Sequence, residues 1–273
     1  MHSPSEFVLE ARGLCKAYTQ GNWWQKKFHC RALHNVDLGL RLGTTLALVG
    51  ASGCGKTTLA VCLVGLEEPD AGEILLNGMS LHQHSKSTRI SVHREIQLIF
   101  QDSAGALNPR MSAIQIVEEP LLIRKQGNRS ERWALAEAMM SRVGISPHWK
   151  HRLPHEFSGG QRQRLAIARA LVLRPRVLIL DEIFVGLDLS IQGQIANLLL
   201  DLQQLQGLSY ICISHDLALV SRIADTVAIM DRGQIVERGD PRELLRQPQH
   251  SVTAALGGEL LTEHSALGAH SGA

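Results

Sequence analysis

Residues 50–57 read GASGCGKT and match the pattern GxxxxGK(S/T) in full. The glycines of such a loop let successive backbone N–H groups turn towards a phosphate, and the lysine reaches the β- and γ-phosphates. The hydroxyl of Thr57 is placed to bind Mg²⁺. A continuous apolar run over 44–50 precedes the loop and a helical pattern follows it, which is the setting that this motif needs. We therefore expect a nucleotide to be bound by Gly50, Ser52, Gly53, Cys54, Gly55, Lys56, Thr57 and Thr58.

A second apolar run, RVLILDE over 176–182, ends in two adjacent carboxylates. In a nucleotide site, Asp181 would hold Mg²⁺ directly or through water. Glu182 would orient and polarise the attacking water as a general base. Taken alone, the pair is equally typical of an acidic helix start after a strand, so the phosphate loop is what favours the catalytic interpretation.

A further Gly-rich turn, FSGGQ over 157–161, opens a clearly helical run. Ser158 and the backbone N–H groups of Gly159 and Gly160 would lie at a helix N-terminus, where a phosphate is favoured. The alternative is a helix cap that binds nothing. One chain thus carries two candidate phosphate sites about a hundred residues apart, which a single bound nucleotide does not explain.

Strands and helices alternate around these motifs. Apolar and polar residues alternate over 6–18 and 32–43, which predicts strands of a half-exposed sheet. Over 103–160 the pattern is helical, with Pro and Gly between the helices. Afterwards we expect helices at 160–173, 190–206 and 216–224 and strands at 176–181, 208–214, 226–231 and 234–239. This order predicts a parallel α/β core that is interrupted by a helical insertion.

The composition is that of an ordinary soluble globular chain, with 273 residues, 44% hydrophobic and 20% charged. The net charge of +2 does not indicate a nucleic-acid partner. The five cysteines show no CxxC spacing, so we expect neither a disulfide framework nor a zinc site, as in a cytosolic protein. Residues 1–13 lack a basic segment followed by an apolar one, so we expect no secretory leader there, and no apolar run reaches the roughly 20 residues that span a bilayer. We therefore expect any membrane attachment to come from a partner.

Together these motifs resemble the ATP-binding subunit of an ATP-binding cassette (ABC) transporter over about residues 7–250. FSGGQ resembles the family signature LSGGQ, with Phe157 in place of the usual Leu. Gln101 in LIFQD falls at the family's Q-loop, and His215 in ISHD falls at its switch histidine. Tyr18 falls at the aromatic residue that stacks on adenine. The resemblance implies ATP and Mg²⁺ as ligands, with Glu182, His215 and Gln101 as catalytic residues and with Thr57, Gln101 and Asp181 as the Mg²⁺ site.

The resemblance also implies a purpose for two phosphate sites. In this family two ATPase subunits pair head to tail, and each ATP lies between the phosphate loop of one subunit and the signature of the other. The signature residues Ser158, Gly159, Gly160 and Gln161 would then contact the partner's ATP. Loss of the γ-phosphate would open the dimer.

The implied fold is α/β, with a RecA-like phosphate-loop core, an N-terminal antiparallel β subdomain and an inserted α-helical subdomain. We expect the core and the β subdomain to cover 5–102 and 161–250, and the helical subdomain to cover 103–160 with the signature at its end. Residues 251–273 are rich in small and polar residues, and we expect a disordered tail there.

One departure from the family pattern falls in the D-loop, where Ser-Ala-Leu-Asp is common. Here the residues are Val185-Gly186-Leu187-Asp188, so Asp188 is kept and the hydroxyl at 185 is lost. Because the D-loop of this family serves the opposite site, communication between the two sites is the property that this departure would affect.

The branch of the family is indicated by FQDSAGALNPR over 100–110, which resembles importers of oligopeptides, dipeptides and nickel. Several stretches look nearest to the second of two non-identical ATPases of nickel importers. No cysteine follows Cys212, so we expect no iron–sulfur cluster of the kind found in some relatives. His29, His34, His82 and His84 do not make up a full ligand set, so we expect surface histidines and not a nickel site on this chain.

The resemblance therefore predicts the ATP-hydrolysing subunit of an importer, for nickel or a metal chelate, with oligopeptide or dipeptide import as the alternative. Export by the same machinery and a soluble ABC ATPase outside transport are further alternatives. The implied partners are a second, non-identical ATPase, two integral-membrane permeases and, indirectly, a solute-binding protein. The implied location is the cytoplasmic face of the inner membrane, as a peripheral protein. Residues 20–31, which include Trp23-Trp24, predict an extended hairpin loop, with a membrane-surface contact as the alternative.

Overall fold

The computed structural model describes residues 6–20, 28–81, 94–102 and 105–256. They divide into two compact units. Unit 1 comprises Met1–Lys86 and Ser209–Ala273, and unit 2 comprises Ser87–Leu208. Residues 21–27 of the predicted hairpin loop, which include Trp23-Trp24, lie outside the described residues, as do the histidines at 82 and 84 and the tail from 257. The flanking residues of that loop, Gln20 and those from Phe28 on, lie in two paired strands.

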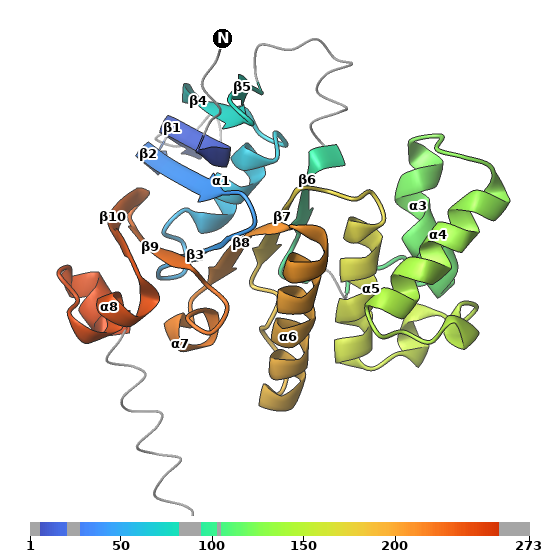
Figure 1. Ribbon diagram of the computed structural model, residues 1–273. Helices are drawn as coiled ribbons and strands as arrows, with labels where there is room; N and C mark the ends of the chain where they lie inside the picture. Colours follow the sequence, from blue (N-terminus) through green and yellow to red (C-terminus); the bar gives the residue numbers. More distant parts are fainter. Residues whose placement is uncertain (1–5, 21–27, 82–93, 103–104, 257–273) are drawn as a thin grey trace, which may run out of the picture. The chain divides into compact units, whose positions relative to one another are not determined.

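Unit 1 contains an antiparallel sheet with the strand order β2-β1-β4-β5 (Figure 1). Its strands are β1 (Phe7–Gln20), β2 (Phe28–Arg41), β4 (Ala71–Leu76) and β5 (Met79–Ser80). The alternation expected for a half-exposed strand is present in β1, where Leu9 and Ala11 are buried and Arg12 is exposed. This sheet confirms the predicted antiparallel β subdomain.

The second sheet of unit 1 positions the phosphate loop. Its strands are β3 (Thr45–Val49), β8 (Ser209–Ser214), β9 (Thr226–Asp231) and β10 (Gln234–Gly239). Strand β3 lies between β8 and β9 and is parallel to both, whereas β10 is antiparallel to β9. All of β3 and β8 is buried, as the continuous apolar runs predict. Helices α1 (Lys56–Leu63), α7 (Leu217–Val220) and α8 (Pro241–Arg246) belong to this unit.

Two predictions in unit 1 differ from the structure. The helix expected over 216–224 is only the short α7, because the chain must turn to reach β9. Asp225 makes that turn: its backbone N–H donates to the Thr45 carbonyl (2.9 Å), and its carboxylate accepts from the Thr45 N–H (2.8 Å). The tail expected to be disordered from 251 is helical over 251–256, and Thr253 within it is only 1% exposed.

Unit 2 contains the parallel pair β6 and β7 and a group of helices. Its elements are β6 (Ile96–Ile99), α3 (Ala113–Ile123), α4 (Arg129–Arg142), α5 (Gly159–Leu171), β7 (Val177–Asp181) and α6 (Leu189–Gln206), with 3₁₀ turns at Pro147–Trp149 and Pro154–Glu156. Helices α3, α4 and α5 pack together (Figure 1). The buried Glu118 joins two of them, since its carboxylate accepts from Arg132 and from the Trp133 indole, both at 2.8 Å. The expected helical segment 103–160 lies within this unit, and its definition as a separate domain remains a prediction.

Candidate functional site

The phosphate loop of unit 1 runs from the end of β3 to the start of α1. The ammonium group of Lys56 donates to the carbonyl oxygens of Gly50 (2.7 Å) and Ala51 (3.0 Å), and the side chain is only 5% exposed. Gly53 and Gly55 have φ angles of +77° and +111°, which other residues rarely adopt. The loop therefore curls around the end of its own lysine side chain, at the N-terminus of a helix, where an anion is favoured.

Two glycines of the loop are required by close packing beneath it. A Cβ atom at Gly50 would lie 2.2 Å from the Met230 carbonyl oxygen, and one at Gly55 would lie 2.3 Å from that of Ala32. At Gly53, by contrast, a Cβ atom would meet nothing within 4 Å among the described residues. Gly50 and Gly55 thus hold the loop against β9 and β2, while Gly53 faces open space.

The turn between β9 and β10 supports the phosphate loop, and sequence reasoning did not identify it. The Gly233 N–H donates to the Cys54 carbonyl (2.8 Å), and the Gly233 carbonyl accepts from the His34 N–H (2.8 Å). Arg232 and Gly233 have φ angles of +44° and +80°, as in a tight hairpin turn. The available signal was the RG pair between two strand patterns.

Cys54 is buried within the loop, with its sulfur 3.9 Å from the Lys56 ammonium. Burial raises the pKa of the Cys54 thiol, and the nearby Lys56 cation only partly opposes this. The thiol therefore stays protonated at neutral pH and acts as a packing group.

Tyr18, the residue predicted to contact the base, lies half-buried on β1. Its hydroxyl donates to the Glu67 carboxylate, and the Lys16 ammonium lies 5.7 Å from the centre of its ring. Burial and the contact with Glu67 raise the pKa of Tyr18 to about 12. The hydroxyl is thus a permanent donor, and Glu67 is a second residue that the sequence analysis missed.

His215, the predicted switch histidine, belongs to the same unit as the phosphate loop. It is exposed and directly follows β8. Val49 and Ser214 are paired in the parallel strands β3 and β8, so the phosphate loop and His215 leave the sheet at the same edge. The carboxyl edge of parallel strands is where such sheets bind ligands.

In unit 2 the predicted catalytic carboxylates lie at the end of β7. Asp181 is the last residue of the strand and is 3% exposed. Glu182 follows it, half-buried, with a φ angle of +49°. A left-handed backbone at a residue with a side chain costs about 1–3 kcal/mol and is concentrated at functional sites. Gln101 lies exposed in the turn after β6, the strand that pairs with β7.

The predicted signature turn forms the N-terminus of α5. Ser158 is the N-cap: its hydroxyl accepts from the Gln161 N–H (3.3 Å), and the Gln161 side chain accepts from the Ser158 N–H (3.0 Å). A Cβ atom at Gly160 would lie 2.6 Å from Ile191 Cγ2, whereas one at Gly159 would have Leu187 Cδ2 at 3.9 Å as its nearest neighbour. The capping box orders the turn and leaves the Gly159 side of it open.

The predicted D-loop packs beside this turn within unit 2, since Leu187 and Ile191 are its neighbours. Asp188 is the N-cap of α6 and accepts from the Ile191 N–H (2.9 Å). Val185 is 46% exposed, and Gly186 has a φ angle of +76°. Asp188 therefore stabilises the start of α6 within this chain. Val185 and Gly186, the two residues that differ from the family pattern, lie on the surface of the described chain.

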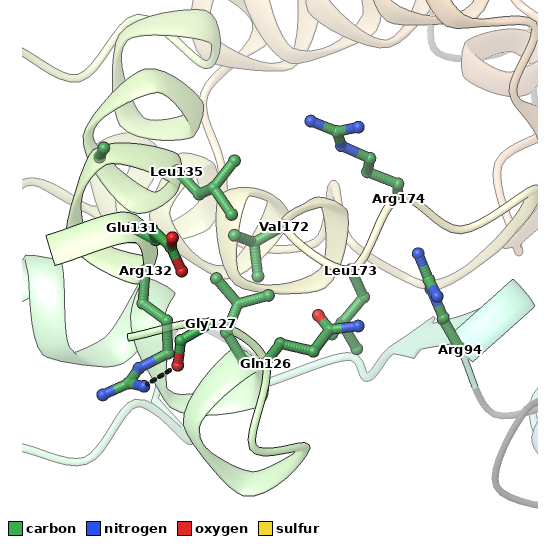
Figure 2. A pocket seen from close by; sticks show the side chains of 11 residues that line it. Arg94, Gln126, Gly127, Glu131, Arg132, Leu135, Val172, Leu173 and Arg174 are labelled. Atoms are coloured by element: carbon green, nitrogen blue, oxygen red, sulfur yellow. Dashed lines mark hydrogen bonds between the residues drawn. The ribbon is translucent and has the colours of Figure 1, made fainter. Parts of the chain in front are cut away.

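Unit 2 also contains a cavity that includes none of the predicted site residues. It has a volume of 610 Å³, and Leu135, Arg94 and Arg174 are among its lining residues. Figure 2 shows Arg94 and Arg174 on one side of it and Arg132, which donates to the Gly127 carbonyl (2.8 Å), on the other. It is therefore separate from the signature, the D-loop and the carboxylates at the end of β7.

The donor atoms predicted for Mg²⁺ are all oxygens, from the Thr57 hydroxyl, the Asp181 carboxylate and the Gln101 amide. Hard oxygen donors with one carboxylate fit an ion that retains waters and binds phosphate oxygens. Within the described ranges, no group of three or more His, Cys, Asp or Glu side chains is placed to hold a metal by itself. The residues present thus suit a nucleotide-bound Mg²⁺.

Comparison with known proteins identifies the class. The family model described as "ABC transporter" matches residues 33–185, which is more than half of the chain. The chain therefore belongs to the ABC transporter ATP-binding family and is an ABC-type ATPase. Among the described helices, none is both long and apolar enough to cross a membrane.

Individual relatives carry peptide-transport names. The chain is 46% identical to the probable D,D-dipeptide transport ATP-binding protein of Escherichia coli K12, over 86% of this chain and 72% of that protein. It is also 46% identical to the dipeptide transport ATP-binding protein of the same strain, over 83% and 68% of the two chains. The glutathione import ATP-binding protein of Pectobacterium atrosepticum is 46% identical over 82% of this chain but only 36% of its own length.

Solved structures confirm the predicted fold. The fold resembles cbiO1 of Clostridium perfringens, part of an ABC transporter complex, with a TM-score of 0.77 and 29% identity over 89% and 92% of the two chains. It also resembles the dimeric post-hydrolysis state of the cassette MJ0796 bound to ADP and Pi, with a TM-score of 0.75 and 25% identity over 86% and 99%.

Proposed function

We propose that this chain is the ATP-hydrolysing subunit of an importer for short peptides. The observation that carries the proposal is its 46% identity, over more than four fifths of its length, to two dipeptide transport ATP-binding proteins. The phosphate-loop geometry supports the ATP-binding part of the proposal. Peptide import was the alternative of the sequence analysis, and these relatives favour it over nickel import.

In the proposed site, unit 1 binds the nucleotide. The N–H groups of the loop 50–58 surround the phosphates, and the Lys56 ammonium exchanges backbone carbonyls for phosphate oxygens. Tyr18 stacks on the base, because an aromatic ring binds any base face for about 1–3 kcal/mol. His215, at the same sheet edge as the loop, contacts the γ-phosphate end.

Unit 2 supplies the hydrolytic groups of the proposed site. Asp181 and Gln101 of this unit, together with Thr57 of unit 1, would hold a Mg²⁺ ion, which would supply charge neutralisation at the β- and γ-phosphates. Glu182 accepts a proton from the attacking water, and its strained backbone fixes where its carboxylate points. Gln101 orients the same water and thereby links the γ-phosphate site to the segment that follows β6.

Pairing of two cassettes accounts for the second phosphate turn. In the proposed head-to-tail dimer, Ser158, Gly159, Gly160 and Gln161 contact the partner's ATP. The dimeric MJ0796 cassette, with its bound ADP and Pi, supports this arrangement. We further propose that the second ATPase is non-identical, that two permeases and a solute-binding protein complete the importer, and that the chain is peripheral on the cytoplasmic face of the inner membrane.

The test is reconstitution of this chain with the second ATPase, the permeases and the binding protein of the proposed importer. ATPase activity and uptake are measured with a dipeptide, a tripeptide, glutathione and Ni²⁺, each with its binding protein. The proposal expects a peptide to stimulate ATPase activity and to accumulate. Stimulation by Ni²⁺ alone would instead support nickel import, and ATPase activity without any permease dependence would contradict a transport role.

A further inference from the structure

Glu67 and Thr58 both contact the hydroxyl of Tyr18, from opposite ends of the same helical segment. Tyr18 donates to the Glu67 carboxylate and is also hydrogen-bonded by the Thr58 side chain. Thr58 lies in the first turn of α1, two residues after the phosphate-loop lysine, whereas Glu67 follows the end of that helix. The tyrosine hydroxyl thus connects β1 to both ends of the helix that begins at the phosphate loop.

The segment that carries Glu67 is itself fixed. The Glu67 N–H donates to the Val61 carbonyl (3.3 Å), which holds it against α1. Its neighbour Asp70 is bound to the strand of Tyr18: the Asp70 carboxylate accepts from the Ala17 N–H (2.7 Å), and the Asp70 N–H donates to the Cys15 carbonyl (2.8 Å). Glu67 is therefore held by backbone hydrogen bonds at a set distance from the tyrosine.

A ring that stacks on a base must be held with its face towards the ligand. Tyr18 lies near the end of a long strand, and the described part of β1 ends two residues later. Without a contact at its hydroxyl, the side chain would be free to change rotamer and would lose conformational entropy on binding. A hydrogen bond at the far end of the ring removes that freedom in advance.

We propose that Glu67 is a positioning residue for the nucleotide site, which fixes the Tyr18 ring for base stacking and ties it to the phosphate-loop helix. This inference rests on the proposed role of Tyr18. Glu67 acts through the tyrosine and does not touch the phosphates, so its effect is confined to ligands that have a base.

The test measures dissociation constants of the purified full chain for MgATP, MgGTP and inorganic tripolyphosphate, which has no base. The variants are Glu67→Ala, Glu67→Gln and Tyr18→Phe, with Glu73→Ala as the control, since Glu73 lies on β4 and its side chain is 43% exposed. Loss of one hydrogen bond predicts about three- to ten-fold weaker ATP and GTP binding for Glu67→Ala and Tyr18→Phe. Tripolyphosphate binding should stay unchanged. Glu67→Gln should remain close to wild type, because its amide oxygen still accepts from the hydroxyl.

Two further readouts separate positioning from a general structural role. In the assembled transporter, Glu67→Ala should raise KM for ATP and leave kcat unchanged. The double variant Glu67→Ala with Tyr18→Phe should be no weaker than Tyr18→Phe alone, because the bond that Glu67→Ala removes is already absent once the hydroxyl is gone.

Equal weakening of ATP and tripolyphosphate binding, or additive effects in the double variant, would overturn the inference. If Glu67→Ala does not fold, Tyr18→Phe and Glu67→Gln still decide the question, since both preserve the size of the side chain. Two negative results can be told apart. If the wild-type chain binds no ATP, the proposed function is contradicted. If the wild-type chain binds ATP and the Glu67 variants bind it equally well, only the inference about Glu67 is contradicted.

Discussion

The ammonium group of Lys56 lies 2.7 Å from the carbonyl oxygen of Gly50, the first glycine of its own loop. Lys56 also reaches Ala51, and the side chain is almost completely buried. Backbone carbonyls are neutral acceptors, so they hold the cation in place without cancelling its charge. A phosphate that enters the loop therefore meets a cation that is already positioned and only partly compensated.

Lys56→Ala should weaken ATP binding by about a hundred-fold, because the charge-assisted hydrogen bonds to the phosphates are lost. The measurement is a titration of the purified chain with a fluorescent ATP analogue. Lys150→Ala is the matched control, since this lysine pairs with Glu137 in the helical region (2.7 Å). Unchanged affinity in Lys56→Ala would show that the loop does not bind the phosphates.

Glu182→Gln should keep ATP affinity and reduce hydrolysis at least about a hundred-fold, the usual contribution of a general base. The amide has nearly the same shape, so the strained backbone at this position is preserved. Phosphate release by the assembled transporter measures the rate, and a stable ATP-bound dimer on a sizing column is the second expected result. Hydrolysis at the wild-type rate would exclude Glu182 as the base.

Local sequence patterns predicted most of the fold and the position of each motif. The run 44–50 and the pattern GxxxxGK(S/T) are determined by neighbouring residues, so they could be read directly, and β3 and the phosphate loop lie where expected. The relationships that were missed join residues distant in the chain. The contact between Tyr18 and Glu67 spans 49 residues, and periodicity carries no information on such pairs.

The two errors in element boundaries have the same origin. The helix expected to reach 224 stops early because Asp225 pairs with Thr45, which is 180 residues away. The helix over 251–256 forms because Glu237, on β10, accepts from the N–H groups of Gln249 and His250, which directly precede the helix, and from the Thr253 hydroxyl in its first turn. In both places tertiary hydrogen bonds outweigh a weak local preference.

A matched pair of glycine variants should separate the fold of the signature turn from its function. Gly160→Ala should destabilise the chain by about 1–3 kcal/mol, because the new methyl group would overlap Ile191. Gly159→Ala has room in this chain and should leave the melting temperature almost unchanged. If the turn contacts the partner's ATP, Gly159→Ala should nevertheless lower transporter ATPase activity. Adding Ile191→Val to Gly160→Ala should recover part of the lost stability, and no recovery would contradict the overlap.

The helix over 251–256 should depend on pH through Glu237. This carboxylate accepts from the Thr253 hydroxyl and from the N–H groups of Gln249 (3.0 Å) and His250 (3.1 Å). Burial would raise the pKa of Glu237, but these hydrogen bonds outweigh it and lower the pKa below its ordinary value of 4.5. The stabilisation is therefore present above that ordinary value and is lost as the pH falls through the lowered pKa.

Glu237→Gln should accordingly lower the melting temperature by a few degrees at pH 7, and the difference from wild type should shrink as the pH falls below the ordinary carboxylate range. Limited proteolysis should show faster cleavage after residue 248 in the variant at pH 7. Glu243→Gln, on α8, is the control for the loss of a carboxylate nearby. A difference in melting temperature that stays constant with pH would contradict this role of the carboxylate.

Val185→Ser should restore the hydroxyl that the family pattern usually has in the D-loop, and it should be made without changing Gly186. The φ angle of +76° at Gly186 would cost an alanine about 1–2 kcal/mol, so a Ser-Ala replacement would confuse strain with function. Val185 is 46% exposed in this chain, so a serine there has room to reach a partner cassette.

With Glu182→Gln blocking this chain's own site, the remaining ATPase activity comes from the partner's site, which this D-loop is expected to contact. A regained hydrogen bond should raise that activity by up to about ten-fold. The reciprocal complex, with the partner's catalytic carboxylate changed to the amide, should respond less, and equal responses of the two complexes would show that the departure at 185 is silent.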